Sequence, residues 1–401
     1  MKIVSIAWRY LWSRPLAAAL NLLLLALGLA AITFGLLTSQ QVDRNFERDL
    51  AGIDLVVGAK GSPIQLILAG VFHIDVPSGN IPLNEVQKLQ ANPQVAKLIP
   101  LSLGDTFKGF RLVGTTPAYA QHYGATLAQG ALWTQAMQAV IGHEVANRTG
   151  LALGNRFAGS HGLGGTGHAH GDNPYQVSGI LAPCGCVLDR LILTATESVW
   201  KVHEDATVAE PSDRAVLEAE REVTMALVTY KSPLAAVSLP RFINTTTDMQ
   251  AAAPAIEITR LLRMVGVGTD VLRGFAAVLL LTAGLSVFIA LWNAVRERRA
   301  DLAMLRMLGA SPQKVAGLVL CEALLLALLA VALGLLMGHL LTALVGYWLQ
   351  TERSLVLTGW IWLVEEWWVL AMGVAVATLA ALLPALNVYR MDVTTLLNSR
   401  Q

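Results

Sequence analysis

The chain has 401 residues, of which 54% are hydrophobic and 14% are charged, and its formal net charge is +1. A soluble domain usually carries about 25% charged residues, so this composition excludes an ordinary soluble globular protein. The near-neutral balance, with no basic stripe carrying interleaved aromatic residues, gives no case for a nucleic acid as partner.

Four long apolar segments account for the shortage of charge, and they cover residues 16–37, 274–295, 315–348 and 367–388. A helix needs about 20 apolar residues to cross the hydrocarbon core. Because a helix satisfies its own backbone polar groups, the segments predict four transmembrane helices. The first apolar run is longer than a signal-peptide core of about 7–15 residues, and no small-x-small site follows it, so we expect an uncleaved anchor.

Basic residues near the ends of the spans predict the orientation. Basic residues precede the first span and are concentrated in the connection between the second and third spans: Lys2, Arg9, Arg14, Arg296, Arg298, Arg299, Arg306 and Lys314. Acidic residues, in contrast, predominate in the connection between the third and fourth spans. We therefore expect a multi-pass protein of the inner (cytoplasmic) membrane with both termini in the cytoplasm. Residues 39–272 would then lie outside the cell membrane.

The segment 39–272 has the pattern of an α+β extracytoplasmic domain. Apolar or alternating runs predict strands at 54–58, 109–114, 176–181, 191–195 and 224–230. Helices are predicted at 40–50, 84–91, 239–244 and 256–265, the second of them capped by Asn84, and 139–149 reads as a strand that passes into a helix closed by Gly150.

The apolar segment 60–82, rich in glycine and proline, follows the exit of the first span. Two interpretations are open for residues 64–72: a surface that covers a lipid-facing or partner-facing groove, or a buried hairpin. His73 and Asp75 lie two residues apart, which fits either a contribution to a metal site or an ordinary surface pair.

A glycine-rich stretch, residues 159–173, interrupts the strand pattern and predicts a loop. It holds three histidines and an acid that could bind Zn²⁺ or Cu²⁺, with Cys184 and Cys186 as further candidates; the four are His161, His168, His170 and Asp172. The alternative is a solvated loop with incidental histidines. Two cysteines are too few for a disulfide framework.

Polar residues inside the third span need partners, because hydrocarbon does not solvate them. We expect structural roles for Glu322, close to the predicted cytoplasmic end, and for His339, towards the outer end. Gly334 and Gly338 form a small-xxx-small face that permits the close approach of another helix.

The connection 297–315, ERRADLAMLRMLGASPQKV, predicts a short amphipathic helix. Its leucines fall on one stripe, Gly309 ends the helix, and Ser311 with Pro312 begins the next one. Such a helix either lies in the lipid interface or docks on a partner.

This string resembles the cytoplasmic loop of FtsX-like permease domains, in which a Glu-Arg pair precedes a helix that ends in Leu-Gly-Ala and a Pro turn. One span, a large outer domain and three further spans is also the plan of the macrolide exporter MacB and of the lipoprotein-release permeases LolC and LolE. The opening WRYLWSRPLAAALNLLLLALGLA, the stretch LALGNRF…YQVSGIL and the closing ALLPALNVYRMDVTTLLNS are similar to the corresponding parts of that family. The resemblance covers nearly the whole chain, and the histidine-glycine insert departs from it.

The resemblance implies a type VII ABC transporter permease with three parts. Residues 1–38 would form the entry helix and first span, 39–272 a MacB-like periplasmic domain, and 273–401 the FtsX-like permease domain. The helix 301–309 would couple to the ATPase through Asp301, Leu302, Leu305, Arg306, Leu308 and Gly309. ATP-driven closure of two ATPase subunits would then move the outer domains of two permease copies, or of a copy and a paralogue, by mechanotransmission.

The chain contains no G-x-x-x-x-G-K-S/T sequence, so this hypothesis places ATP on a separate cytoplasmic ABC ATPase subunit and no cofactor directly on the permease, Zn²⁺ aside. Further expected partners are membrane lipids and a periplasmic partner protein or lipoprotein, and no nucleic acid. The cargo would be a lipoprotein, a hydrophobic molecule or something linked to zinc acquisition. Two alternatives are an FtsX-like regulatory scaffold and a metal-sensing membrane protein, whereas no nucleophile–base arrangement indicates an enzyme.

Overall fold

The computed structural model describes residues 3–161, 173–204, 220–352 and 357–391. Its contacts divide the chain into two compact units, Met1–Asp43 with Val265–Gln401 and Arg44–Met264. The first, called the helical unit below, contains only helices among its described elements, and the second, the α+β unit, combines helices with sheets.

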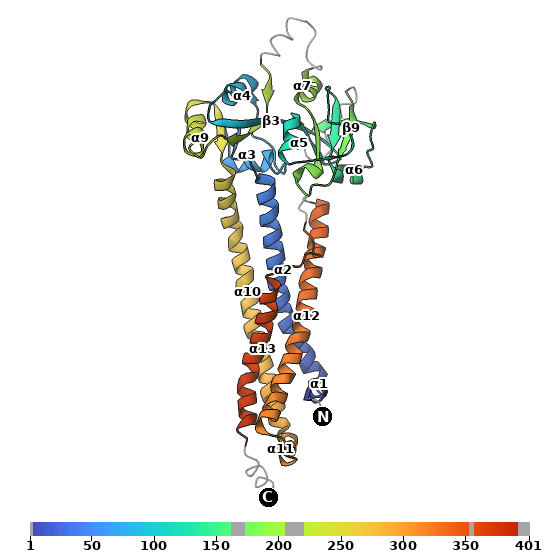
Figure 1. Ribbon diagram of the computed structural model, residues 1–401, viewed down its shortest axis with the longest axis vertical. Helices are drawn as coiled ribbons and strands as arrows, with labels where there is room; N and C mark the ends of the chain where they lie inside the picture. The colour runs from blue at the N-terminus through green and yellow to red at the C-terminus, as the bar shows by residue number, and fades with distance from the viewer. Residues whose placement is uncertain (1–2, 162–172, 205–219, 353–356, 392–401) are drawn as a thin grey trace. The chain divides into compact units, whose positions relative to one another are not determined.

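The helical unit is built mainly from long helices, and two of them, α2 and α10, extend in sequence into the α+β unit (Figure 1). The described helices are α1 (Ile3–Leu11), α2 (Pro15–Leu50), α10 (Pro254–Glu297), α11 (Arg299–Met307), α12 (Pro312–Glu352) and α13 (Glu366–Tyr389). Four stretches are long and apolar enough to cross a membrane, namely Pro15–Leu50, Asp270–Glu297, Pro312–Leu349 and Glu366–Tyr389. The four predicted spans are confirmed, as are the helical continuations at 40–50 and 256–265.

Small residues bring α12 close to α2, as their spacing predicts. A Cβ added at Gly338 would lie 2.6 Å from Thr33 Cβ, and one added at Gly334 would lie 2.8 Å from Leu29 Cβ. Both distances are shorter than side chains tolerate, so these two glycines set the separation of the helices.

The α+β unit is built on an 11-stranded sheet in which nine strands follow the order β13-β1-β12-β3-β4-β10-β6-β9-β5, while β7 pairs with β9 and β8 with β3. A second, two-stranded sheet joins β11 and β2. The strands are β1 (Leu55–Ala59), β2 (Ile81–Pro82), β3 (Val95–Phe107), β4 (Phe110–Thr115), β5 (Leu127–Gly130), β6 (Gln138–Ile141), β7 (Arg156–Phe157), β8 (Ser160–His161), β9 (Tyr175–Leu181), β10 (Leu191–Ala195), β11 (Glu222–Val223), β12 (Met225–Tyr230) and β13 (Met249–Ala252).

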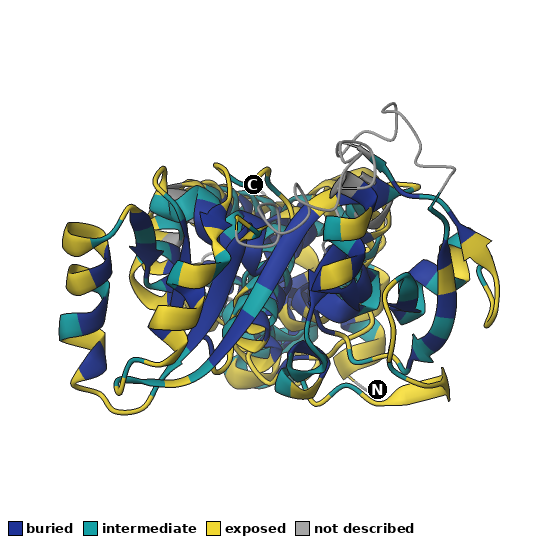
Figure 2. Cartoon of the chain, turned by 90° about the horizontal axis from the view of Figure 1, so that it is seen from above, coloured by how far each residue is buried: buried dark blue, intermediate teal, exposed yellow. Residues whose placement is uncertain are grey.

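Strand β3 joins the two halves of the large sheet. Its first half, from Val95 to Leu101, pairs with β12, and its second half, from Ser102, pairs with β4. Apolar clusters are buried around these strands, which Figure 2 shows as largely dark blue ribbons beside helices with exposed yellow faces. One continuous strand therefore ties the two halves into a single unit.

Short helices complete the α+β unit: α3 (Pro63–Gly70), α4 (Leu83–Gln90), α5 (Pro117–His122), α6 (His143–Thr149), η1 (Val187–Arg190), α7 (Thr196–Glu204) and α9 (Ala235–Thr246). Three expectations need correction. Pro82, not Asn84, occupies the N-cap of α4. Residues 64–72 do not form a hairpin, because Pro63 begins α3, which buries Leu66 and Ile67.

The third correction concerns His73, which is not part of a surface pair. It is only 7% exposed, and its Nε2 lies 2.9 Å from the hydroxyl oxygen of Tyr119. Asp75 has a different role, since its carbonyl oxygen accepts a hydrogen bond from Arg111 at 2.8 Å.

Candidate functional site

Helix α11 lies between α10 and α12 in the chain and has well-formed ends. Asp301 is in its first turn and Arg306 in its last, which suits the helix dipole. Gly309 has a φ of 94°, and the amides of Gly309 and Ala310 donate to the carbonyl oxygens of Arg306 and Leu305 at 3.1 and 3.0 Å. This is the Schellman pattern that stops a helix.

The inner face of α11 is anchored in the helical unit. Leu302 and Ala303 are buried, and Leu302 belongs to an apolar cluster that also contains Val315 and Leu318 of α12. Leu305 is half-buried and packs against this cluster. The Arg306 guanidinium donates to the carbonyl oxygen of Met391, which follows α13. The helix is therefore fixed to two neighbouring parts of the unit.

The opposite face of α11 is bare and apolar. Met304, Met307 and Leu308 are 55%, 56% and 79% exposed, and we call these three residues the α11 patch. An exposed cluster of large apolar side chains is typical of an interaction surface.

The six residues predicted for ATPase coupling thus fall into two groups. Leu302, Leu305 and Arg306 hold the helix in place, whereas Asp301, Leu308 and Gly309 are exposed. The prediction that Leu308 shares one stripe with Leu302 and Leu305 is wrong, because Leu308 is the C-cap residue and is exposed. Met304 and Met307 were missed, although their spacing of three residues places them on one face.

An arginine at the N-cap of α11 fastens the helix to two other elements. The Arg298 guanidinium lies 3.4 Å from the Glu322 carboxylate of α12. Its other nitrogen donates to the Tyr10 carbonyl oxygen at 2.9 Å and to the Ser13 hydroxyl at 2.6 Å. Arg298 also lies over the Tyr10 ring at 4.4 Å. Glu322, which the sequence left without a partner, therefore helps to position α11.

A second buried polar group joins α12 to the start of α13. His339 Nε2 lies 3.0 Å from the Glu366 carboxylate, and its Nδ1 lies 2.7 Å from the carbonyl oxygen of Gly359. Glu366 is fully buried, and its other oxygen accepts a hydrogen bond from the Leu363 amide at 2.9 Å. The connection before α13 is also held to α2, because Gln41 exchanges two hydrogen bonds with the backbone of Thr358.

The α+β unit contains a buried aromatic and basic cluster close to β4. Burial, together with the nearby charges of Arg111 and Arg190, holds the pKa of His73 well below its usual value, so its ring is neutral. Burial and the neighbouring Tyr123 raise the pKa of Tyr119, so this hydroxyl keeps its proton. His73 and Tyr119 are consequently joined by a hydrogen bond between two neutral groups, not by an ion pair.

The predicted metal ligands are not brought together in the described part of the chain. His161 lies in β8, whose backbone pairs with Asp105 of β3, whereas His168, His170 and Asp172 fall outside the described residues. Among the described residues, no group of three or more His, Cys, Asp and Glu side chains could hold a metal ion. Cys184 and Cys186 form a disulfide bond with each other, which corrects their interpretation as metal ligands.

Two family models match the chain. Residues 273–393 match the FtsX-like permease C-terminal domain, and residues 18–232, more than half of the chain, match the MacB-like periplasmic core domain. The chain belongs to the FtsX-like/MacB-like ABC permeases. This permease therefore combines four helices of the inner membrane with a MacB-like α+β domain.

Curated relatives of the permease are longer than it is. It is 24% identical over 382 residues to the pyoverdine export ATP-binding/permease protein PvdT of Pseudomonas putida, covering 85% of this chain and 53% of the relative. The protein of the same name from Pseudomonas fluorescens is 22% identical over 366 residues, covering 84% and 52%. The permease thus spans about half the length of these relatives.

Two solved structures resemble the α+β part. The periplasmic region of MacB from Actinobacillus actinomycetemcomitans covers 53% of this chain and 95% of its own, at 13% identity and a TM-score of 0.35. The extracellular domain of the noncanonic ABC-type transporter YknZ from Gram-positive bacteria covers 50% and 98%, at 14% identity and a TM-score of 0.31.

Proposed function

We propose that this permease converts ATP hydrolysis by a separate cytoplasmic ATPase into movement of its α+β domain, with α11 as the coupling helix. The observation that carries the proposal is the asymmetry of α11, which is anchored on its inner face and bare at the α11 patch. A subunit docked on the patch pushes on Arg298 and its neighbours. The displacement then passes to α10, which is one continuous helix from Pro254 to Glu297. Strand β13 of the α+β unit directly precedes α10 in the sequence, so movement of α10 is transmitted to the sheet.

The family supports the partners of this proposal. The relatives named above are ATP-binding/permease proteins, which supports an ABC ATPase as the partner of this permease. A second permease copy or a paralogue completes the assembly. Their names make export the direction to test first, with a hydrophobic molecule, a lipoprotein or a metal-linked cargo as the substrate class.

The test uses Leu308→Asp in the full permease co-expressed with its ATPase. Leu308 is 79% exposed, so a charge there leaves the fold intact while it opposes an apolar partner. We expect loss of ATPase co-purification and of permease-stimulated hydrolysis. Leu305→Asp is a poorer probe, because Leu305 packs half-buried against the anchoring cluster.

The matched control is Val237→Asp on α9, which is 76% exposed in the α+β unit. This variant should co-purify with the ATPase and stimulate it like the wild type. Retention of both properties by Leu308→Asp would contradict the proposal and leave α11 as a helix of the lipid interface.

A further inference from the structure

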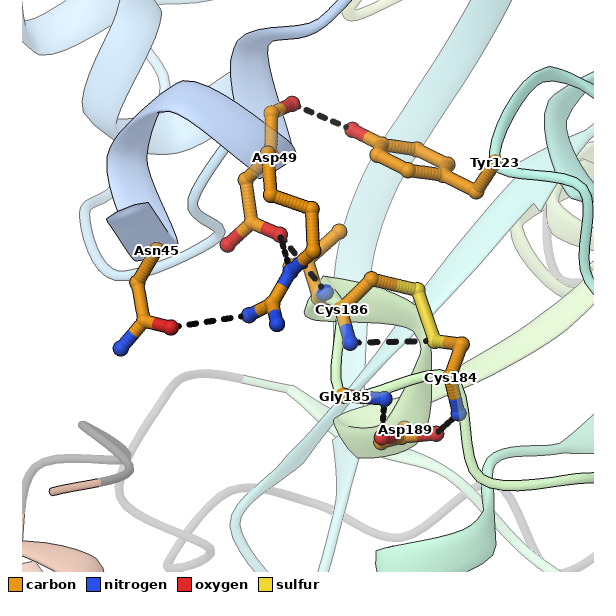
Figure 3. The surroundings of a disulfide bond; sticks show 9 residues. Asn45, Asp49, Tyr123, Cys184, Gly185, Cys186 and Asp189 are labelled. Atoms are coloured by element: carbon orange, nitrogen blue, oxygen red, sulfur yellow. Dashed lines mark hydrogen bonds and ion pairs between the residues drawn. A yellow bond between two sulfur atoms is a disulfide. The ribbon is translucent and has the colours of Figure 1, made fainter. Parts of the chain in front are cut away.

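The last turn of α2 fits into a set of contacts within the α+β unit, which we call the stalk socket and define as Tyr123 and residues 184–187 (Figure 3). The buried Asp49 is at its centre. Its carboxylate accepts a hydrogen bond from the Val187 amide at 3.2 Å, and its carbonyl oxygen accepts one from the Tyr123 hydroxyl at 2.9 Å. Both the side chain and the backbone of Asp49 are therefore hydrogen-bonded to the domain.

Arg48 supplies a second contact on the same turn. A Cβ added at Gly185 would lie 3.2 Å from the Arg48 guanidinium, so the arginine lies against the glycine backbone. Asn45, one turn earlier on α2, accepts a hydrogen bond from Arg48 at 3.0 Å and holds it in place. Gly185 has a φ of 63°, which a larger residue would adopt only with strain.

The turn that receives α2 is braced from within. The disulfide bond joins Cys184 to Cys186, and the amides of Cys184 and Gly185 donate to the Asp189 carboxylate at 3.0 and 2.7 Å. Cys186 is 7% exposed and belongs to the main apolar cluster of the unit. A pull on the turn is therefore a pull on the core of the domain.

The disulfide contributes little to the stability of the whole chain, because it closes a loop with a sequence separation of only 2. The loss of unfolded-state entropy grows with the length of the loop that is closed, and this loop is among the shortest possible. Its effect is consequently local, on the shape of the turn at Gly185 and on the amide that Val187 offers to Asp49.

We propose that the stalk socket is the point at which α2 moves the α+β domain, and that the Cys184–Cys186 bond keeps it rigid enough to do so. The inference rests on the proposed function, and it adds that the movement of Arg298 also reaches the first span, because Arg298 is bonded to Tyr10 and Ser13 just before α2. Helix α2 is unbroken from Pro15 to Leu50, so a displacement of the span arrives at Asp49. Asp49, Tyr123 and the disulfide are positioning elements, and none of them contacts ATP.

The experiment follows ATP-driven movement in the permease–ATPase complex in lipid nanodiscs. Fluorophores on noncanonical residues at Val237 and Trp360, which are 76% and 86% exposed, report the distance between the α+β domain and the connection before α13. Cysteine is left out of the labelling, and Cys321, the one free cysteine among the described residues, is replaced by alanine. ATP hydrolysis is measured on the same samples.

We expect the wild type to change its distance on ATP addition, and Cys184→Ser with Cys186→Ser to lose that change while hydrolysis persists. Reduction of the folded wild type by dithiothreitol tests the same bond without a folding step. The reagent gives two electrons and two protons to the disulfide, which becomes two thiols, and leaves as a cyclic disulfide.

Two substitutions of Asp49 sharpen the test. Asp49→Ala removes the acceptor for the Val187 amide and should abolish the distance change. Asp49→Asn keeps an oxygen acceptor and should retain it. Glu85→Gln, which breaks only the exposed pair with Lys88 on α4, should behave like the wild type.

The possible failures are distinguishable. A wild type that hydrolyses ATP without any change in distance would remove the proposed function and this inference with it. A wild type that moves, with a reduced or doubly substituted form that moves equally, would remove the stalk socket alone.

Discussion

Replacing Glu322 by alanine should destabilise the helical unit and release α11. Its carboxylate lies 3.4 Å from the Arg298 guanidinium, and the two side chains are only 10% and 15% exposed. At an effective dielectric constant of about 20, charges at this distance attract by about 5 kcal/mol. Breaking one side of a buried pair costs about 3–5 kcal/mol. Arg298 keeps its bonds to Tyr10 and Ser13, so we expect a loss of about 3 kcal/mol.

The assay is reversible unfolding of the purified permease in mixed detergent micelles, followed by ATPase stimulation in nanodiscs. Stimulation should fall with stability, because Arg298 is the N-cap of α11. The matched control is Arg298→Met with Glu322→Met, which removes both charges and should cost less than Glu322→Ala alone. A loss below about 1 kcal/mol for Glu322→Ala, the value of an exposed ion pair, would refute this reasoning.

Three further predictions address other polar groups. Glu366→Gln keeps bonds to His339 and the Leu363 amide and should stay within about 1 kcal/mol of the wild type in unfolding assays, whereas Glu366→Ala should lose about 2–3 kcal/mol; equal losses would contradict this pairing. The pKa of His73 is lowered in the folded state, so its neutral ring contributes fully to the free energy of unfolding above about pH 6.5. This contribution is lost as the pH falls below that value, by up to about 1.4 kcal/mol per pH unit. His73→Gln should flatten that slope in unfolding at several pH values, and an unchanged slope would contradict it; burial lowers the pKa of His122 as well, and that contribution remains. Calorimetric zinc titration should show fewer sites after alanine substitution of His161, His168 and His170, and an unchanged stoichiometry would remove these histidines as the predicted zinc ligands.

The membrane part was predictable because hydrocarbon imposes a strict requirement on length and polarity. The four spans were located to within a few residues at most ends, and the glycine spacing in α12 correctly predicted its close approach to another helix. In the α+β unit, the predicted strand 191–195 coincides with β10. A short apolar run between turns is typical of a buried strand, because it is too short for a buried helix.

Strand β3 was missed for a physical reason. It contains Pro100 and Gly104, which ordinarily argue against a central strand, and its pairing with β12, β4 and β8, which the local sequence does not report, stabilises it. A similar limit applies to the N-terminus of α4, where Asn84 has the propensity of a cap but lies inside the first turn.

The sequence predicted the helix of the candidate site, but it did not predict the contacts that hold this helix in place. Local spacing indicated α11, whereas the partners of its Arg298 come from α12 and the N-terminal segment, 24 and 285 or more residues away. The bond between Asp49 and Val187 spans 138 residues, and no local pattern reports it. Contacts of this kind depend on the packing of whole elements, which a single sequence does not display.

Photo-crosslinking from α11 tests the central claim most directly. A photoreactive amino acid at Leu308, which is 79% exposed, should form an adduct with the ATPase subunit in membranes that contain both proteins, and one at Val237 on α9 should not. Adducts at Leu308 that contain only lipid would contradict an ATPase-driven permease coupled through α11.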